Sequence, residues 1–204
     1  MILCLVMTWL CAAASVAQSG SKRSGSTPGS NTVTDIRQVD FLNFTYRSSI
    51  CSQEYLRQGF GKSIPVRNGE FKNKNVYFAV ADDGIIYADV TGDEREEAIV
   101  PIQCGAVTAN YHLSEVNVFT FGDGRATLLA EISDTNMERD YRRTFPDAES
   151  YWGVADVKVR DGNFAIEVIV DGSHASPKYL ATLEYRLRGK TFQLTGKPRR
   201  RFDH

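Results

Sequence analysis

Five dipeptides that end in glycine mark tight turns along the chain, and they constrain the fold more than any other feature. They are Asn68-Gly69, Asp83-Gly84, Asp123-Gly124, Asp161-Gly162 and Arg188-Gly189. Each supplies the positive φ that a two-residue β-hairpin turn requires. The segments between them are rich in β-branched and aromatic residues, which favour strands. The sequence therefore predicts a mainly β fold of antiparallel sheets built of hairpins, in a sandwich or an open barrel-like arrangement with little helix.

Apolar residues alternate where strands with one buried face are expected. Phe164, Ile166, Val168 and Val170 share one face of their stretch. Ile85–Ala88 is instead apolar on both faces, which is typical of a strand that is covered on both sides. We therefore expect the hairpin that contains this stretch to lie centrally in its sheet.

Two stretches do not follow this alternation. Ser133–Tyr151 is long for a connection in a compact domain, and such connections are usually functional or disordered. Ser49–Phe60 is expected to contain a short helical turn that Gly59 and Gly61 would end.

The N-terminus has the pattern of an export signal. Met1–Ala17 is apolar and ends with the small residues Ser15 and Ala17 at a cleavage-like spacing. We expect cleavage after Ala17, export to the periplasm or the extracellular space, and no transmembrane segment in the mature chain. Because no Lys or Arg precedes the apolar run, an uncleaved anchor or a buried helix stays open as an alternative.

Composition divides the rest of the chain. Residues 18–34 form a Gly/Ser/Thr-rich tract that is expected to be a flexible linker. Residues 35–196 are long enough for one β domain with a single substantial core. Residues 197–204 form a basic tail that we expect to be frayed and solvated. A formal net charge of −1 gives no reason to expect a nucleic acid as partner.

Two cysteines remain after the signal is removed. Cys51 and Cys104 are expected to form a disulfide, because exported chains mature in an oxidising compartment. A cysteine nucleophile would need a histidine partner, and the histidines of the mature chain are His112, His174 and the terminal His204. The pattern favours the disulfide.

One acidic stretch has the oxygen spacing of a calcium loop. Its candidate ligands are the side chains of Asp89, Thr91, Asp93 and Glu97 and the carbonyl oxygen of Arg95. Glu94 stands where calcium loops have glycine, and a left-handed conformation costs a non-glycine residue about 1 kcal/mol. A plain turn with solvated acids is therefore the favoured alternative, and calcium is the candidate cofactor.

The same stretch resembles the loop of FG-GAP/VCBS-type repeats. Asp-Val-Thr-Gly-Asp at 89–93, followed by Glu97 and an apolar strand that reaches Cys104, is similar to the single loop of a group of exported, β-rich bacterial proteins and lipoproteins of unknown role. This resemblance implies export and no particular reaction. The absence of further repeats in the sequence argues against a propeller.

The irregular stretch carries side chains that are common at protein interfaces. They are Met137, Tyr141, Arg142, Arg143, Phe145, Tyr151 and Trp152. Two interpretations stay open: an interaction loop, or a lid that covers the sheet. The acids at 134–140 are expected to be solvated.

These features favour a secreted or periplasmic, non-enzymatic binding or structural module, with calcium as a candidate stabilising ion. Its partner would be an envelope or extracellular protein or polymer, and no nucleic acid. The alternative is a metal-assisted hydrolase on a β scaffold, and it has less support because no nucleophile with a partner can be identified in the sequence.

Overall fold

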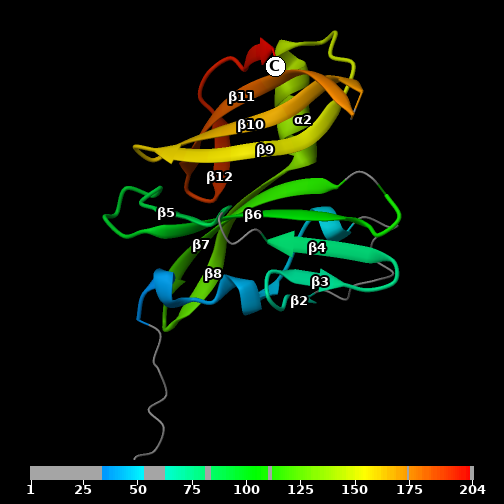
Figure 1. Ribbon diagram of the computed structural model, residues 1–204. Helices are drawn as coiled ribbons and strands as arrows, with labels where there is room; N and C mark the ends of the chain where they lie inside the picture. Colours follow the sequence, from blue (N-terminus) through cyan, green and yellow to red (C-terminus); the bar gives the residue numbers. More distant parts are fainter. Residues whose placement is uncertain (1–33, 53–62, 81–83, 110–111, 174, 203–204) are drawn as a thin grey trace, which may run out of the picture. The chain divides into compact units, whose positions relative to one another are not determined.

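The computed structural model describes residues 34–52, 63–80, 84–109, 112–173 and 175–202. They belong to one compact unit that is mainly β, with antiparallel sheets in a sandwich-like arrangement (Figure 1). The predicted fold class is confirmed. The predicted signal, most of the predicted linker and most of the stretch 49–60 lie outside the described residues.

The central sheet has six strands. They are β3 (Glu70–Lys72), β4 (Val76–Val80), β5 (Ile86–Ala88), β6 (Glu97–Ala106), β7 (Leu113–Gly122) and β8 (Arg125–Ser133). The order is β3-β4-β6-β7-β8, and β5 pairs with the first residues of β6 while β4 pairs with its last residues.

The outer sheet has five strands. They are β9 (Tyr151–Arg160), β10 (Asn163–Ser173), β11 (Ser176–Arg188), β12 (Thr191–Leu194) and β13 (Arg199–Phe202). The order is β12-β11-β10-β9. The strands β13 and β12 lie along the same edge of β11: β13 pairs with its first half and β12 with its last residues. Two irregularities interrupt the pairing of β9 with β10, and β9 is an edge strand among the described residues.

The N-terminal segment adds short elements beneath the central sheet. They are the 3-10 turns η1 (Ile36–Gln38), η2 (Phe41–Asn43) and η3 (Ile50–Ser52), and a two-stranded sheet of β1 (Thr45–Tyr46) and β2 (Ile64–Pro65).

Two hydrophobic cores lie on opposite faces of the central sheet. On one face, Ile99 and Val116 pack with Phe164 of the outer sheet. On the other face, Val100 packs with Tyr46 of the N-terminal segment. Side chains of a strand alternate between its faces, so β6 and β7 contribute to both cores. The stretch Ile85–Ala88, which was expected to be covered on both sides, is only half-buried as β5. Its hairpin partner β6 is the strand that is buried on both faces.

The predicted turns connect these strands. Asp123-Gly124 joins β7 to β8 and Asp161-Gly162 joins β9 to β10, with positive φ at both residues of each turn. Asp83 of the Asp83-Gly84 turn lies outside the described residues.

The stretch after β8 differs from the prediction, because Asp134–Thr144 forms the helix α2. The side-chain oxygen of Asn136 accepts hydrogen bonds from the backbone N–H and the hydroxyl of Ser133, which closes the first turn. Met137 and Tyr141 are four residues apart and share the buried face of the helix. A search for strand alternation cannot detect this pattern, which has the helical period.

The basic tail also differs from the prediction. Arg199–Phe202 is the strand β13 and pairs with Tyr179–Thr182 of β11, so it belongs to the domain and is not frayed. Among the described residues, no helix is long and apolar enough to cross a membrane.

The predicted disulfide between Cys51 and Cys104 is confirmed. It joins η3 to β6 across a sequence separation of 53 residues, and both cysteines are buried in the core beneath the central sheet.

We predict that replacing both cysteines by alanine lowers the free energy of unfolding by about 4 kcal/mol, because a closed loop of this length restricts the unfolded chain. Urea unfolding of the oxidised protein and the variant measures the difference. Reduced wild-type protein is the control and should unfold near the variant. Equal midpoints for all three samples would contradict this account of the disulfide.

Candidate functional site

The acidic loop at 89–97 is held together by its own groups. Asp89 Oδ1 accepts hydrogen bonds from the backbone N–H groups of Thr91 (3.1 Å) and Gly92 (2.6 Å), and its Oδ2 accepts one from Glu94 (2.9 Å). These backbone donors lower the pKa of Asp89 below its ordinary value, the bond from Gly92 having the largest effect. The Asp89 carboxylate therefore organises the turn.

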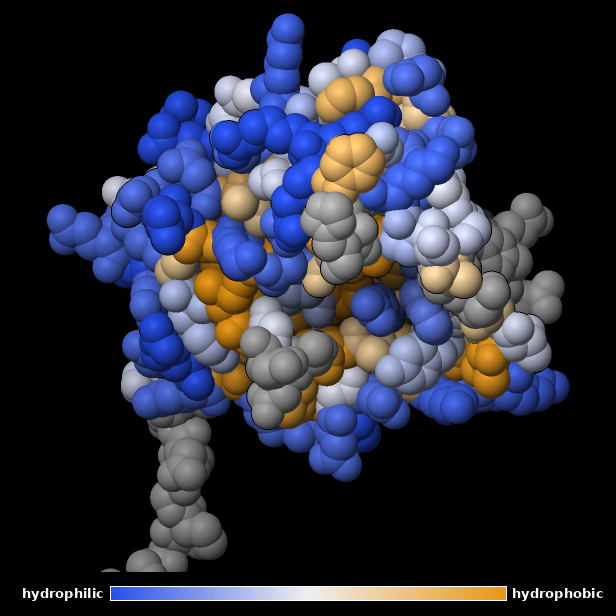
Figure 2. All heavy atoms as spheres, turned by 45° about the horizontal axis from the view of Figure 1, so that its top comes forward, coloured by the Kyte–Doolittle hydropathy of each residue, from blue (hydrophilic) through white to orange (hydrophobic). Residues whose placement is uncertain are grey.

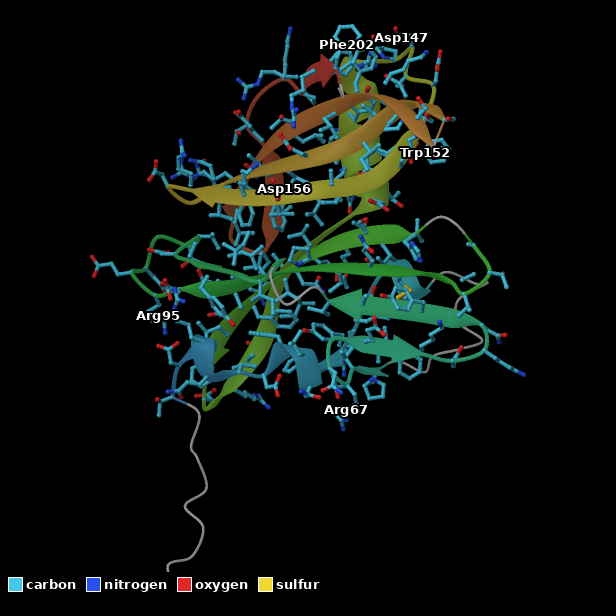
Figure 3. All side chains as sticks on the ribbon, in the orientation of Figure 1. Arg67, Arg95, Asp147, Trp152, Asp156 and Phe202 are labelled. Carbon is cyan, nitrogen blue, oxygen red and sulfur yellow. A yellow bond between two sulfur atoms is a disulfide. The ribbon has the colours of Figure 1, made fainter. Side chains whose placement is uncertain are left out.

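The other predicted ligands have different surroundings. The Asp93 carboxylate binds the side chain of Arg95, whose exposed guanidinium lies at the loop (Figure 3). Glu97 is buried and its Oε2 accepts a hydrogen bond from the backbone N–H of Val90 (3.1 Å). Desolvation raises the pKa of Glu97. Glu94 has a φ of 66°, so it adopts the left-handed conformation that calcium loops assign to glycine.

This geometry fits the plain-turn alternative. Within the described ranges, no group of three or more His, Cys, Asp or Glu side chains is arranged to hold a metal ion. Calcium binding by Asp89, Asp93 and Glu97 stays a prediction, since a cation would have to compete with the internal donors.

The predicted interaction residues separate into buried and accessible groups. Met137 and Tyr141 are fully buried in the core between the two sheets, and Tyr151 is nearly so. While β13 and the sheets cover them, a partner cannot contact such side chains. These three residues therefore fit the second interpretation, in which the segment covers the sheet as a lid.

The remaining four are partly or fully accessible. Arg142 donates to Glu138 and to the carbonyl oxygen of Ala148, and it ties the helix to the segment that follows it. Arg143 is exposed and pairs with Asp140. The half-buried Phe145 and Trp152 lie at the end of α2 and on β9 respectively, and the Trp152 indole N–H donates to the carbonyl oxygen of Gly172 (Figure 3).

A groove between the two sheets has a volume of about 590 Å³. Its floor is the part of the central sheet formed by β4 and β6, with Tyr77, Ala79, Pro101 and Gln103. Its wall is the stretch of β9 from Val154 to Val157. Figure 2 shows hydrophobic residues gathered in the middle of one face of the molecule, between hydrophilic ones.

The polar groups of this inter-sheet groove are acidic or neutral. Glu70 and Asp156 lie at its sides, and no Lys or Arg belongs to its described lining. The Tyr77 hydroxyl donates to Glu70 Oε1 at 3.3 Å, and desolvation together with Glu70 raises the pKa of this tyrosine, so the hydroxyl stays protonated. Gln103 is exposed. The groove suits a ligand that brings hydrogen-bond donors or positive charge.

The edge of β9 is protected against pairing with another strand. The backbone N–H of Val154 donates to Ser114 Oγ (3.3 Å), and that of Val157 donates to Asp156 Oδ1 (2.8 Å). Bulges also interrupt this edge strand, as they often do where a protein avoids strand addition. Recognition in the groove would therefore use side chains more than backbone pairing.

Two buried acids lie beside the groove and have strongly raised pKa values. Desolvation raises the pKa of Glu115 to about 7 and that of Asp134 to about 7. Asp134 accepts hydrogen bonds from the backbone N–H of Ser114 (2.5 Å) and the hydroxyl of Tyr151 (3.1 Å). It connects the start of α2 to β7 and β9 and has no free oxygen.

Glu115 points away from the groove. Its Oε2 accepts hydrogen bonds from the backbone N–H groups of Ser49 (2.9 Å) and Ile50 (3.2 Å) and from the Ser49 hydroxyl (2.6 Å), all in the segment beneath the central sheet. Its Oε1 is buried without a hydrogen-bond partner, as are both side-chain polar atoms of the neighbouring Asn117. The Oε2 atom of Glu115 therefore fastens the N-terminal segment rather than facing a substrate.

Sequence reasoning did not identify the groove. It is formed by strands far apart in the chain, and each strand supplies between one and four of the lining residues. One signal was present: Gln103 is a polar residue inside an otherwise apolar run.

Comparison with known proteins gave no match to a family model, to a curated protein or to a solved structure. The geometry of the chain itself therefore carries the functional argument.

We predict that calcium raises the thermal midpoint by a few degrees and that a chelator reverses the shift, if the loop binds the ion. Glu97→Gln should remove the shift while its amide oxygen still accepts the bond from Val90. Glu96→Gln is the matched control, because Glu96 pairs with Arg37 outside the proposed ligand set. Calorimetry measures both variants. An identical midpoint with calcium and with chelator in the wild type would end the metal hypothesis.

A second prediction concerns Glu115. Its pKa is raised from 4.5 to about 7 in the folded state, so the unfolded chain loses this proton at lower pH than the folded chain does. The resulting stability is complete below about pH 4.5 and is lost as the pH rises through about 7, a change of about 3 kcal/mol for a buried group.

Glu115→Gln should therefore reduce the loss of stability between pH 5 and pH 8, as measured by urea unfolding at the two pH values. Asp134 keeps part of the dependence, since its pKa is raised in the same sense. Asp147→Asn, which removes an exposed carboxyl group elsewhere on the surface, is the control. If the Glu115 variant and the wild type lose the same stability, the carboxyl of Glu115 is not protonated in the folded protein.

Proposed function

We propose that this protein is an exported, non-enzymatic binding module and that the inter-sheet groove is its ligand site. The observation that carries the proposal is a cavity of about 590 Å³ between two sheets, with a lining of mixed apolar and polar groups. Ligand sites in proteins commonly have volumes of about 300–1,000 Å³ and this mixed lining. Three of the predicted interaction residues, Met137, Tyr141 and Tyr151, are buried, and we therefore propose the groove as the site in place of that loop.

The lining indicates the chemistry of the ligand. Glu70 and Asp156 place negative charge at the groove, while Tyr77 and Gln103 offer an aromatic face and an amide. Amines are attracted by such carboxylates and by aromatic faces, and hydroxyl groups are bound by amides and carboxylates. We propose a polymer with amino and hydroxyl groups, such as an oligosaccharide of amino sugars, as the ligand class.

Two features support export. The apolar stretch Met1–Ala17 has the pattern of a cleaved signal. The bond between Cys51 and Cys104 is the kind that persists in oxidising compartments. Calcium at the loop that begins at Asp89 would add stability in such a compartment, and the likeness of this loop to those of exported β-rich bacterial proteins agrees with that location.

A metal-assisted hydrolase has less support. Such an enzyme needs a metal and an acid or base at one place. The Asp89 and Asp93 carboxylates are engaged by backbone amides and by Arg95, and the buried Glu115 carboxylate points away from the groove. We therefore propose binding without a chemical step.

The test compares oligomers of glucosamine, glucose and glucuronate by isothermal titration with the full mature chain. Glucosamine oligomers should bind best and glucuronate oligomers should not bind. Tyr77→Ala and Glu70→Gln should each weaken binding about tenfold, equivalent to about 1.4 kcal/mol. Lys72→Ala, an exposed change on β3 outside the groove lining, is the matched control. Binding of the acidic oligomer, or unchanged affinity in both groove variants, would contradict the proposal.

A further inference from the structure

The guanidinium of Arg200 lies among aromatic rings. Its central carbon is 3.8 Å from the ring centroid of Phe145, 5.2 Å from that of Tyr141 and 5.4 Å from that of Tyr179. Arg200 Nε donates to the Tyr141 hydroxyl at 2.6 Å, and Nη2 forms an ion pair with Asp171 Oδ2 at 3.2 Å. Aromatic faces and a carboxylate around a cation are a recognised binding arrangement. We call these four surrounding residues the guanidinium cage.

The guanidinium cage is built without β13. Tyr141 belongs to α2, Phe145 caps that helix, Asp171 belongs to β10 and Tyr179 to β11. These elements are held in place by the core between the two sheets, to which both tyrosines and Phe145 contribute. The core therefore holds the rings of Tyr141 and Phe145 in place, whereas the Tyr179 ring also packs against Phe202 of β13.

Asp171, the acid of the cage, also accepts hydrogen bonds from residues outside β13. Asp171 Oδ1 accepts a hydrogen bond from the backbone N–H of Glu149 (2.8 Å), and Oδ2 accepts one from the Tyr141 hydroxyl (3.0 Å). Asp171 is only 4% exposed, so a carboxylate with no remaining partner would be costly there. Because these donors remain when Arg200 is absent, the empty cage would keep its shape and its charge. A site organised in advance binds more tightly, since little order is lost on binding.

The strand β13 is attached as a peptide ligand would be. It adds to the edge of β11, and its exposed Arg199 and Arg201 pair with Glu184 and Glu167. Phe202 is 62% exposed, lies beside the end of α2 (Figure 3), and packs its ring against that of Tyr179 with the two planes tilted by 43°. Only Arg200 is inserted. Edge pairing with one anchored side chain is a common mode of peptide recognition.

We propose that the guanidinium cage and the adjoining edge of β11 form a binding site for an extended peptide strand that carries an arginine, and that β13 occupies this site from within the same chain. The covalent connection gives β13 a high effective concentration, in the millimolar range for short connections. A strand from another molecule binds when β13 is released. Because acidic and basic groups hold the strand on the surface, salt favours its release.

The first experiment refills the cage with a small molecule. In the full chain, Arg200→Ala should lower the thermal midpoint by about 3 °C, and millimolar ethylguanidinium should restore the loss. Arg201→Ala is the matched control: it removes an exposed arginine of the same strand, and ethylguanidinium should have no effect on it. Ethylammonium, which lacks the planar guanidinium group, should restore little of the thermal midpoint that Arg200→Ala loses. If ethylguanidinium raises the thermal midpoint of neither variant, or raises both midpoints equally, the cage is not a guanidinium site. If Arg200→Ala is unfolded, Arg200→Lys takes its place.

The second experiment uses a labelled peptide with the sequence of residues 197–202. It should bind the Arg200→Ala chain at least tenfold more tightly than the wild type, whose own strand competes. The same peptide with alanine in place of its central arginine should lose this binding. Equal binding of both peptides overturns the proposal. Sedimentation of the wild type then tests the source: a concentration-dependent dimer that Arg200→Ala abolishes assigns the strand to a second copy, and a monomer at all concentrations excludes a second copy as its source.

Discussion

The structure depends on the burial of β6 and β7 on both of their faces. Ile99 and Val116 contribute to the core beneath the outer sheet, while their neighbours Val100 and Ile102 contribute to the core above the N-terminal segment. Each of these strands therefore stabilises both layers, and a substitution on either face changes the stability of the shared sheet. The disulfide at Cys104 and the Glu115 carboxylate fasten the N-terminal segment to the same two strands. The layers are therefore expected to unfold together.

Both proposed binding sites lie where a sheet is no longer covered by a neighbouring element. Beyond Ile99, the upper face of β6 continues through Pro101 and Gln103, which the outer sheet does not cover, and the inter-sheet groove lies there. The bulged edge of β9 forms the wall, and its exposed backbone donors are bound by Ser114 and Asp156. At the far side of the outer sheet, β11 exceeds the length of β12 and leaves an edge on which β13 lies.

Prediction from sequence succeeded where the determinants are local. The glycine dipeptides define turns within a few residues, so the hairpins and the mainly β class could be predicted. The left-handed conformation of Glu94 was not predicted, because its cost to a non-glycine residue was the argument against a calcium-type loop. The helix α2 was missed because Met137 and Tyr141 follow the helical period, and β13 was missed because three consecutive arginines look like a solvated end. Their partners Asp171, Glu184 and Glu167 are distant in sequence, and so are the strands that line the groove.

Native-state hydrogen exchange by NMR tests most directly whether the shared sheet holds the two layers together. The account predicts that the amides of β6 and β7 are the slowest to exchange and do so only by global unfolding, with the same denaturant dependence as amides of β10 and β11. Amides of β13 should exchange through a smaller, salt-sensitive opening. If the amides of β6 and β7 exchange through a lower-energy opening than those of β10 and β11, the central sheet is not the element on which the rest depends.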